Sequence, residues 1–134
     1  MRGELAAVAL LIALPGLSGC AEGDGPRTAV VTVQHSAYLP SSLTVRAGQQ
    51  LVLELRNDDP IDHEWIVGDE AVHARHREGT EPAHDERPTE VTVPARSTRT
   101  TTVVFDTPGT YRFVCHLPGH EVYGMTGVLT VLAA

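Results

Sequence analysis

The chain contains no lysine. All 10 of its basic residues are arginines, and 17 acidic residues outweigh them, which gives a formal net charge of -7 at pH 7. Proteins that bind nucleic acid need Lys and Arg side chains to neutralise phosphates, so this balance argues against a nucleic-acid ligand. The net charge identifies no other partner, because it bears on association and solubility only.

Cysteine is also scarce: there are 2 cysteines in 134 residues, too few for a scaffold built on disulfides. Cys20 and Cys115 lie far apart in unlike surroundings, which predicts two unrelated roles. No internal repeat is visible. The length and the 42% hydrophobic content fit one domain with one core, and not two.

Long apolar runs are absent as well. The run from Leu5 to Leu17 is too short to span a membrane, which takes roughly 20 residues, but it fits the core of a signal peptide. It ends in Leu17-Ser-Gly-Cys20, which resembles a bacterial lipobox. The resemblance predicts a cleaved lipoprotein signal peptide over residues 1–19, lipidation of Cys20 and a flexible tether over residues 20–27.

An ordinary secretory signal with a chance cysteine is the alternative interpretation of the same segment. We expect an extracytoplasmic domain anchored to a membrane, on the periplasmic or the cell-surface side.

From Thr28 onward the pattern changes to short β-branched or alternating runs separated by turn residues. We expect one domain over residues 28–134. Such a series of short strands predicts an all-β fold, an antiparallel sandwich or barrel of about seven or eight strands. The expected strands cover residues 29–33, 42–46, 50–56, 61–67, 90–93, 98–105, 110–115 and 126–132.

Residues 68–88 do not follow this pattern of short strands and are rich in acidic residues, arginine and histidine. We interpret them as a long surface insertion, in which residues 71–78 can form two helical turns. His73 and His76 could meet on one helical face and bind Zn²⁺ or Cu²⁺ loosely. A solvated polar loop that also holds His84 is the preferred interpretation, because real sites need more ligands held in place.

Three side chains with metal-binding chemistry lie between the last two expected strands: the thiol of Cys115, the imidazole of His120 and the thioether of Met125. Tyr111, Phe113 and Cys115 are in phase along their strand, so the sulfur should point inward at the strand's end.

A second imidazole comes from the expected strand 61–67. Its period-2 alternation places His63 on the same face as Ile61, Val67 and the single tryptophan, Trp65, while Asp62 and Glu64 point the other way. His63 therefore shares an apolar face that could meet the loop.

Two histidines and one cysteine with a weak axial methionine form the ligand pattern of blue-copper electron-transfer sites. Thiolate and thioether favour Cu(I), whereas imidazole accepts both oxidation states. Taken singly, a buried Cys or Met is more often a packing residue. It is the agreement of spacing and strand phase that favours a copper site.

The segment Cys115-x₄-His120-x₄-Met125, with its flanking strands, resembles the cupredoxins, the type 1 blue copper proteins. Further matches are Leu39–Gly48, Asn57-Asp-Asp ahead of His63, and Asp106–Cys115. The resemblance covers residues 28–132. It implies a Greek-key β-sandwich that binds one copper ion, with His63, Cys115 and His120 as equatorial ligands and Met125 as the axial ligand.

The resemblance also implies that the exposed edge of His120 is the electron port. An apolar rim around it would suit a small, transient contact with a redox partner. The rim residues are Leu117, Pro118, Val122 and Tyr123.

The expected function is single-electron transfer by a monomer, between redox proteins such as a cytochrome or an oxidase. No catalytic set is evident in the sequence, so an enzyme is not expected. The alternatives are a copper-binding, delivery or resistance protein and an interaction module on the same fold. His116 has no assigned role: multicopper oxidases place a histidine beside the copper-binding cysteine, but this chain has no His-x-His pair.

Overall fold

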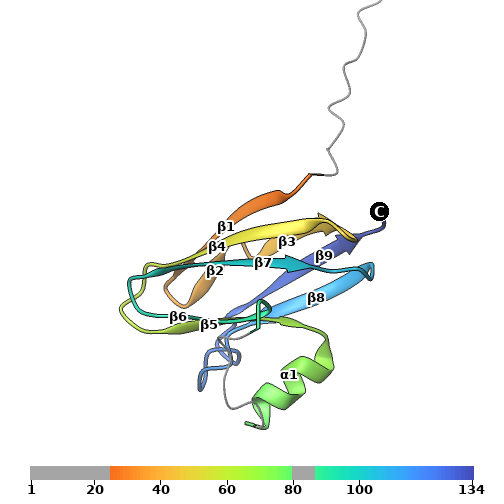
Figure 1. The fold of residues 1–134 in the computed structure, drawn as a ribbon. Helices are drawn as coiled ribbons and strands as arrows, with labels where there is room; N and C mark the ends of the chain where they lie inside the picture. Colours follow the sequence, from red (N-terminus) through yellow and green to blue (C-terminus); the bar gives the residue numbers. More distant parts are fainter. Residues whose placement is uncertain (1–24, 80–86) are drawn as a thin grey trace, which may run out of the picture.

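A computed structural model describes residues 25–79 and 87–134. These residues form two β-sheets that enclose one core, with a single short helix outside the five-stranded sheet (Figure 1). The elements in order are β1 (Arg27–Gln34), β2 (Ala37–Leu39), β3 (Ser42–Arg46), β4 (Gln50–Asn57), β5 (His63–Gly68), α1 (Glu70–Arg77), β6 (Glu90–Val93), β7 (Thr98–Val104), β8 (Gly109–Val114) and β9 (Thr126–Leu132).

The predicted signal peptide, Cys20 and residues 20–24 of the predicted tether lie outside the described residues, and so do residues 80–86 of the predicted insertion. Of the described helices, none is long and apolar enough to cross a membrane.

One sheet has the order β2-β1-β4-β7 and the other the order β3-β9-β8-β5-β6. The prediction of an all-β sandwich is confirmed. The expected antiparallel pairing holds for most neighbouring strands but was wrong for two pairs, because β1 pairs in parallel with β4 and β3 in parallel with β9. The strand β2, with three residues, was too short to show an alternation in the sequence.

The core follows the alternation along each strand. Leu51, Leu53 and Leu55 are at most 1% exposed, and the intervening side chains of β4 lie nearer the surface. Phe113 packs over its strand partner Gly127, where an added Cβ would lie 2.0 Å from the ring. This close contact fixes the two strands of the β8–β9 hairpin just before they enter the loop.

Strand β5 departs from the predicted alternation. All six of its residues are buried, including Glu64, which was expected to face away. Ile61, expected on the inner face, precedes the strand and is 47% exposed. Because β5 lies between β8 and β6 and is covered by α1, it has no solvated face.

Helix α1 confirms the predicted helical turns and corrects the interpretation of its surroundings. Its N-cap residue Asp69 accepts a hydrogen bond from the amide of Val72, 3.0 Å away. Its two histidines, His73 and His76, are 1% and 9% exposed. The helix is therefore a packed part of the domain and not a solvated insertion.

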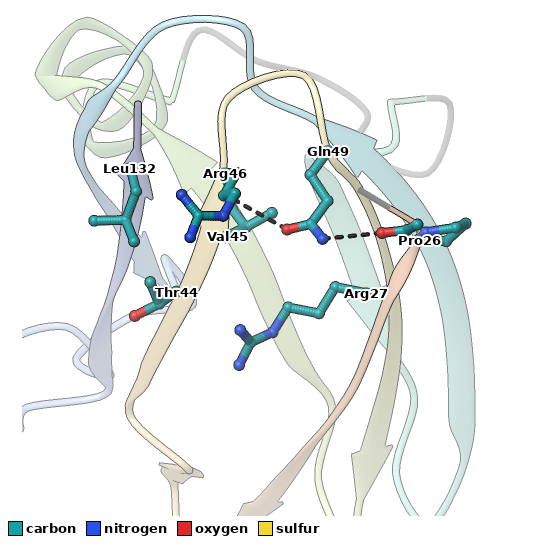
Figure 2. Close-up of a pocket in the computed structure, with 8 residues that line it drawn as sticks. Pro26, Arg27, Thr44, Val45, Arg46, Gln49 and Leu132 are labelled. Carbon is teal, nitrogen blue, oxygen red and sulfur yellow. Dashed lines mark hydrogen bonds between the residues drawn. The ribbon is translucent and has the colours of Figure 1, made fainter. Parts of the chain in front are cut away.

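The two ends of the sandwich differ. At one end of the sandwich, strand β4 finishes, strand β5 starts and the β8–β9 loop joins its two strands. At the other end, strands β3 and β9 finish side by side. At that second end a surface pocket of about 390 Å³ lies between the start of β1 and the end of β3 (Figure 2). No cysteine or histidine lines this pocket, whereas the group of close metal-binding donors found among the described residues lies at the first end.

Candidate metal centre

His63, Cys115 and His120 offer three donor atoms that lie within 4.8 Å of one another. His63 begins β5, Cys115 directly follows β8, and His120 lies in the β8–β9 loop. His63 and Cys115 are fully buried, and His120 is partly exposed. The Sγ atom of Cys115 is 3.3 Å from Nδ1 of His120. Two strands and one loop thus bring together three residues that the sequence predicted to meet.

Met125, the fourth predicted residue, is also fully buried. Its carbonyl accepts a hydrogen bond from the amide of Cys115 at 3.2 Å, and its own amide donates to the carbonyl of His120 at 2.9 Å. These two bonds close the loop and return its last residue to the side of Cys115.

Asp59 is a residue of the site that sequence reasoning missed. Its Oδ2 lies 2.9 Å from Nε2 of His63, and the amides of His35 and Ser36 donate to its two oxygens, each at 2.8 Å. Burial alone would raise the pKa of Asp59, but the bonds from Ser36, His35 and His63 outweigh it and lower the pKa. The signal available in the sequence was the acidic turn Asn57-Asp-Asp59 ahead of His63.

This pairing settles which nitrogen of His63 is free. Because a carboxylate can only accept, Nε2 of His63 carries the proton and Nδ1 carries a lone pair. Nδ1 is buried and has no hydrogen-bond partner among the described residues. Burial lowers the pKa of His63, which keeps that lone pair available. A buried acceptor without a partner is costly, and a metal ion would satisfy it.

Cys115 is a free cysteine whose Sγ accepts a hydrogen bond from the amide of Glu64 at 3.4 Å. Burial raises its pKa to about 11, although the amides of Glu64 and Leu117 partly oppose this shift. The thiol is therefore protonated at neutral pH, and a metal ion would displace its proton. Sulfur and imidazole donors, of which those of His63 and Cys115 are fully buried, suit copper.

His116 is not part of this donor group. Its Nε2 lies 2.9 Å from Nδ1 of His73, and its ring stacks on that of His76 with the centroids 5.2 Å apart. Burial lowers the pKa of His116 to about 4. The histidines of α1 thus pack against His116 of the β8–β9 loop, and His84 lies outside the described residues.

The predicted apolar rim is present in part. Val122 and Tyr123, which follow His120 closely, are 88% and 89% exposed, and Pro118 is also exposed. Leu117 instead packs against the hydrophobic core. The surface beside His120 therefore carries two large, solvated apolar side chains.

Comparison with known proteins agrees with this fold. A copper-resistant cuproprotein, CopI, from Rubrivivax gelatinosus is 30% identical over 105 residues, which cover 76% of this chain and 64% of that protein. The reduced auracyanin of Roseiflexus castenholzii is 26% identical with a TM-score of 0.66, covering 80% of this chain and 98% of that one. Auracyanin A of Chloroflexus aurantiacus, described as a "blue" copper protein, is 27% identical with a TM-score of 0.63, covering 80% and 99%.

The profile of the cupredoxin-like domain matches residues 6–131, which is most of the chain. With the two-sheet architecture and the site at one end, this match makes the protein a member of the cupredoxin-like family.

Proposed function

We propose that the protein is a mononuclear type 1 copper protein that transfers single electrons. His63, Cys115 and His120 would form the trigonal ligand set, and Met125 the weak axial ligand. The observation that carries the proposal is the meeting of three donor atoms within 4.8 Å at the end of the sandwich.

Copper, when bound, supplies the one-electron chemistry, and the protein supplies a fixed geometry. Burial of His63 and Cys115 keeps water from the donors, and the paired strands around the loop limit their movement when the charge of the site changes. His120, partly exposed, offers the route to the surface. Val122 and Tyr123 beside it suit a small contact with a redox protein such as a cytochrome or an oxidase.

The test is addition of Cu²⁺ to the purified protein. We expect an intense blue colour and a narrow copper hyperfine splitting in electron paramagnetic resonance, because both arise from a covalent copper–thiolate bond. Cys115→Ser should abolish the colour while circular dichroism shows the same β-sheet content. A colourless wild-type protein with an ordinary Cu²⁺ spectrum would exclude the type 1 assignment.

A second candidate function is copper resistance or delivery, favoured by the similarity to the copper-resistant cuproprotein. Electron transfer requires that copper stay bound through repeated reduction and oxidation. Delivery requires release of Cu(I) to an acceptor. Reduction in the presence of a competing Cu(I) chelator separates the two: retention of copper supports electron transfer, and rapid loss supports delivery.

The place of action is part of the same proposal. We infer a lipoprotein that is anchored through Cys20 on the extracytoplasmic side of a bacterial membrane. Cys20→Ser should move the protein from the membrane fraction to the soluble fraction, since acyl chains contribute about 0.8 kcal/mol per buried CH₂ to membrane binding. A variant that still sediments with membranes would contradict lipid anchoring.

A further inference from the structure

Helix α1 contacts the β8–β9 loop at two residues, each of which directly follows a candidate copper ligand. His73 of α1 contacts His116, which follows Cys115, with 2.9 Å between Nδ1 and Nε2. Arg77, one turn further along the helix, contacts Glu121, which follows His120. The helix therefore bridges the two ends of the Cys115–His120 segment.

The contact with His116 has a defined direction. The carbonyl of Arg112 can only accept, so Nε2 of His73, 3.2 Å from it, donates. In the neutral ring Nδ1 of His73 then accepts from Nε2 of His116. His76 stacks on the same ring of His116 at an interplanar angle of 21°. The backbone of His116 is held as well, because its amide donates to Oε2 of Glu64 at 3.2 Å.

The contact with Glu121 is a two-pronged ion pair. Nε and Nη2 of Arg77 lie 2.9 Å and 2.7 Å from the two carboxylate oxygens of Glu121. Arg112 of β8 approaches the same carboxylate at 3.4 Å. The forked geometry fixes orientation as well as distance, and the Glu121 side chain is only 23% exposed. The loop is thus tied to α1 and to β8 immediately after His120.

We propose that α1 positions the copper-ligand loop, with His73 acting through His116 and Arg77 through Glu121. Neither is one of the four candidate ligands. Their effect would be to restrict where the thiolate of Cys115 and the imidazole of His120 can move. The spectroscopic part of this inference rests on the proposed type 1 copper function, whereas the effect on the loop does not.

The first test uses the copper-free protein and amide hydrogen exchange. The amides of Tyr123, Gly124 and Met125 donate within the loop and report its local opening. We expect Arg77→Gln to speed their exchange about threefold and His73→Phe to speed it about tenfold, since an exposed ion pair contributes less than a buried hydrogen bond. Amides of β4 and β7 should keep their wild-type rates.

Arg75→Gln is the matched control. Arg75 is an exposed arginine of the same helix, and it donates to the carbonyl of Ala71 in α1 itself. Its replacement should leave loop exchange at the wild-type rate. Equal loop exchange in Arg77→Gln, Arg75→Gln and wild type would overturn the proposal, even if His73→Phe fails to fold.

The second test uses the copper-loaded protein. Arg77→Gln should broaden or shift the thiolate-to-copper absorption and hasten copper loss several-fold, while Arg75→Gln should not. A purely structural role for α1 would lower global stability and leave this spectrum unchanged. If wild-type protein shows no type 1 spectrum, the proposed function fails, and the exchange experiment still decides the role of α1.

Discussion

Oδ2 of Asp59 lies 2.9 Å from Nε2 of His63, and the backbone amides of two further residues donate to the same carboxylate. The pair leaves Nδ1 of His63, which is buried and has no hydrogen-bond partner in the described part of the chain, as the free acceptor of the site. The arrangement is a carboxylate–imidazole pair of the kind that orients a metal-binding histidine.

Replacement of this carboxylate should weaken copper binding. Asp59→Asn removes the charge that fixes the tautomer of His63, and we expect copper affinity to fall about 10- to 100-fold. Competition with a copper chelator measures the change. Asp58→Asn, at the exposed neighbouring position, is the matched control and should bind as wild type does. If Asp59→Asn binds copper as tightly as Asp58→Asn does, Asp59 does not support His63 as a ligand.

The buried thioether of Met125 should tune the reduction potential. Met125→Gln replaces a soft axial donor by an oxygen that favours Cu(II), so the potential should fall while copper stays bound. A redox titration followed by the blue absorption gives the potential, and electron paramagnetic resonance confirms that copper is retained. An unchanged potential would mean that Met125 is not the axial ligand.

Gly127 leaves room for the ring of Phe113, so even a methyl group there should destabilise the fold. A Cβ would lie 2.0 Å from that ring and 2.7 Å from the carbonyl of Ser41. We expect Gly127→Ala to lower the free energy of unfolding by about 1–3 kcal/mol, measured by urea denaturation. Gly25→Ala, where nothing lies within 4 Å, should stay within about 0.5 kcal/mol of wild type. Equal stability of the two variants would contradict this packing.

The copper-free protein should lose stability in mild acid. Burial holds the pKa of His73 below its ordinary value of 6.5 and that of His116 at about 4, so both rings are neutral when folded. The unfolded chain binds more protons, and stability falls as pH drops from about 6.5 toward about 4. The charged and titratable groups that face these two histidines are Arg112, Arg77, Glu121, His76 and the other ring of the pair.

Urea unfolding between about pH 7 and about pH 5 measures this slope. His73→Gln removes one of the two groups and should give a shallower dependence on pH than wild type. The same slope in the variant and in wild type would show that His73 does not titrate on unfolding.

Much of the fold could be predicted from strand alternation. β3, β6 and β9 begin and end at the residues that the sequence pattern indicated. Period 2 also placed His63 and Cys115 inward, because each strand buries one face against the other sheet. The parallel pairs were beyond this reasoning, since alternation indicates a face and not the direction of a neighbour.

The surroundings of the site were harder to predict. Asp59 and Glu64 carry carboxylates, which a sequence pattern assigns to solvent, yet both are buried at 7% exposure. His73 and His76 were misplaced for the same reason. For Asp59, Glu64 and His73, hydrogen bonds across the fold offset the cost of burial, and their partners His35, Ser36 and His116 lie far away in the sequence.

The parallel pairing of β3 with β9 has a consequence for folding. It joins Ser42 to Val128 and Arg46 to Leu132, so β9 takes its place only after most of the chain has been brought together. Cys115 and Met125 flank the β8–β9 loop, and their places depend on β9 being in the sheet. We therefore expect copper uptake late in folding, so that the appearance of the thiolate–copper band during refolding reports completion of the long-range sheet.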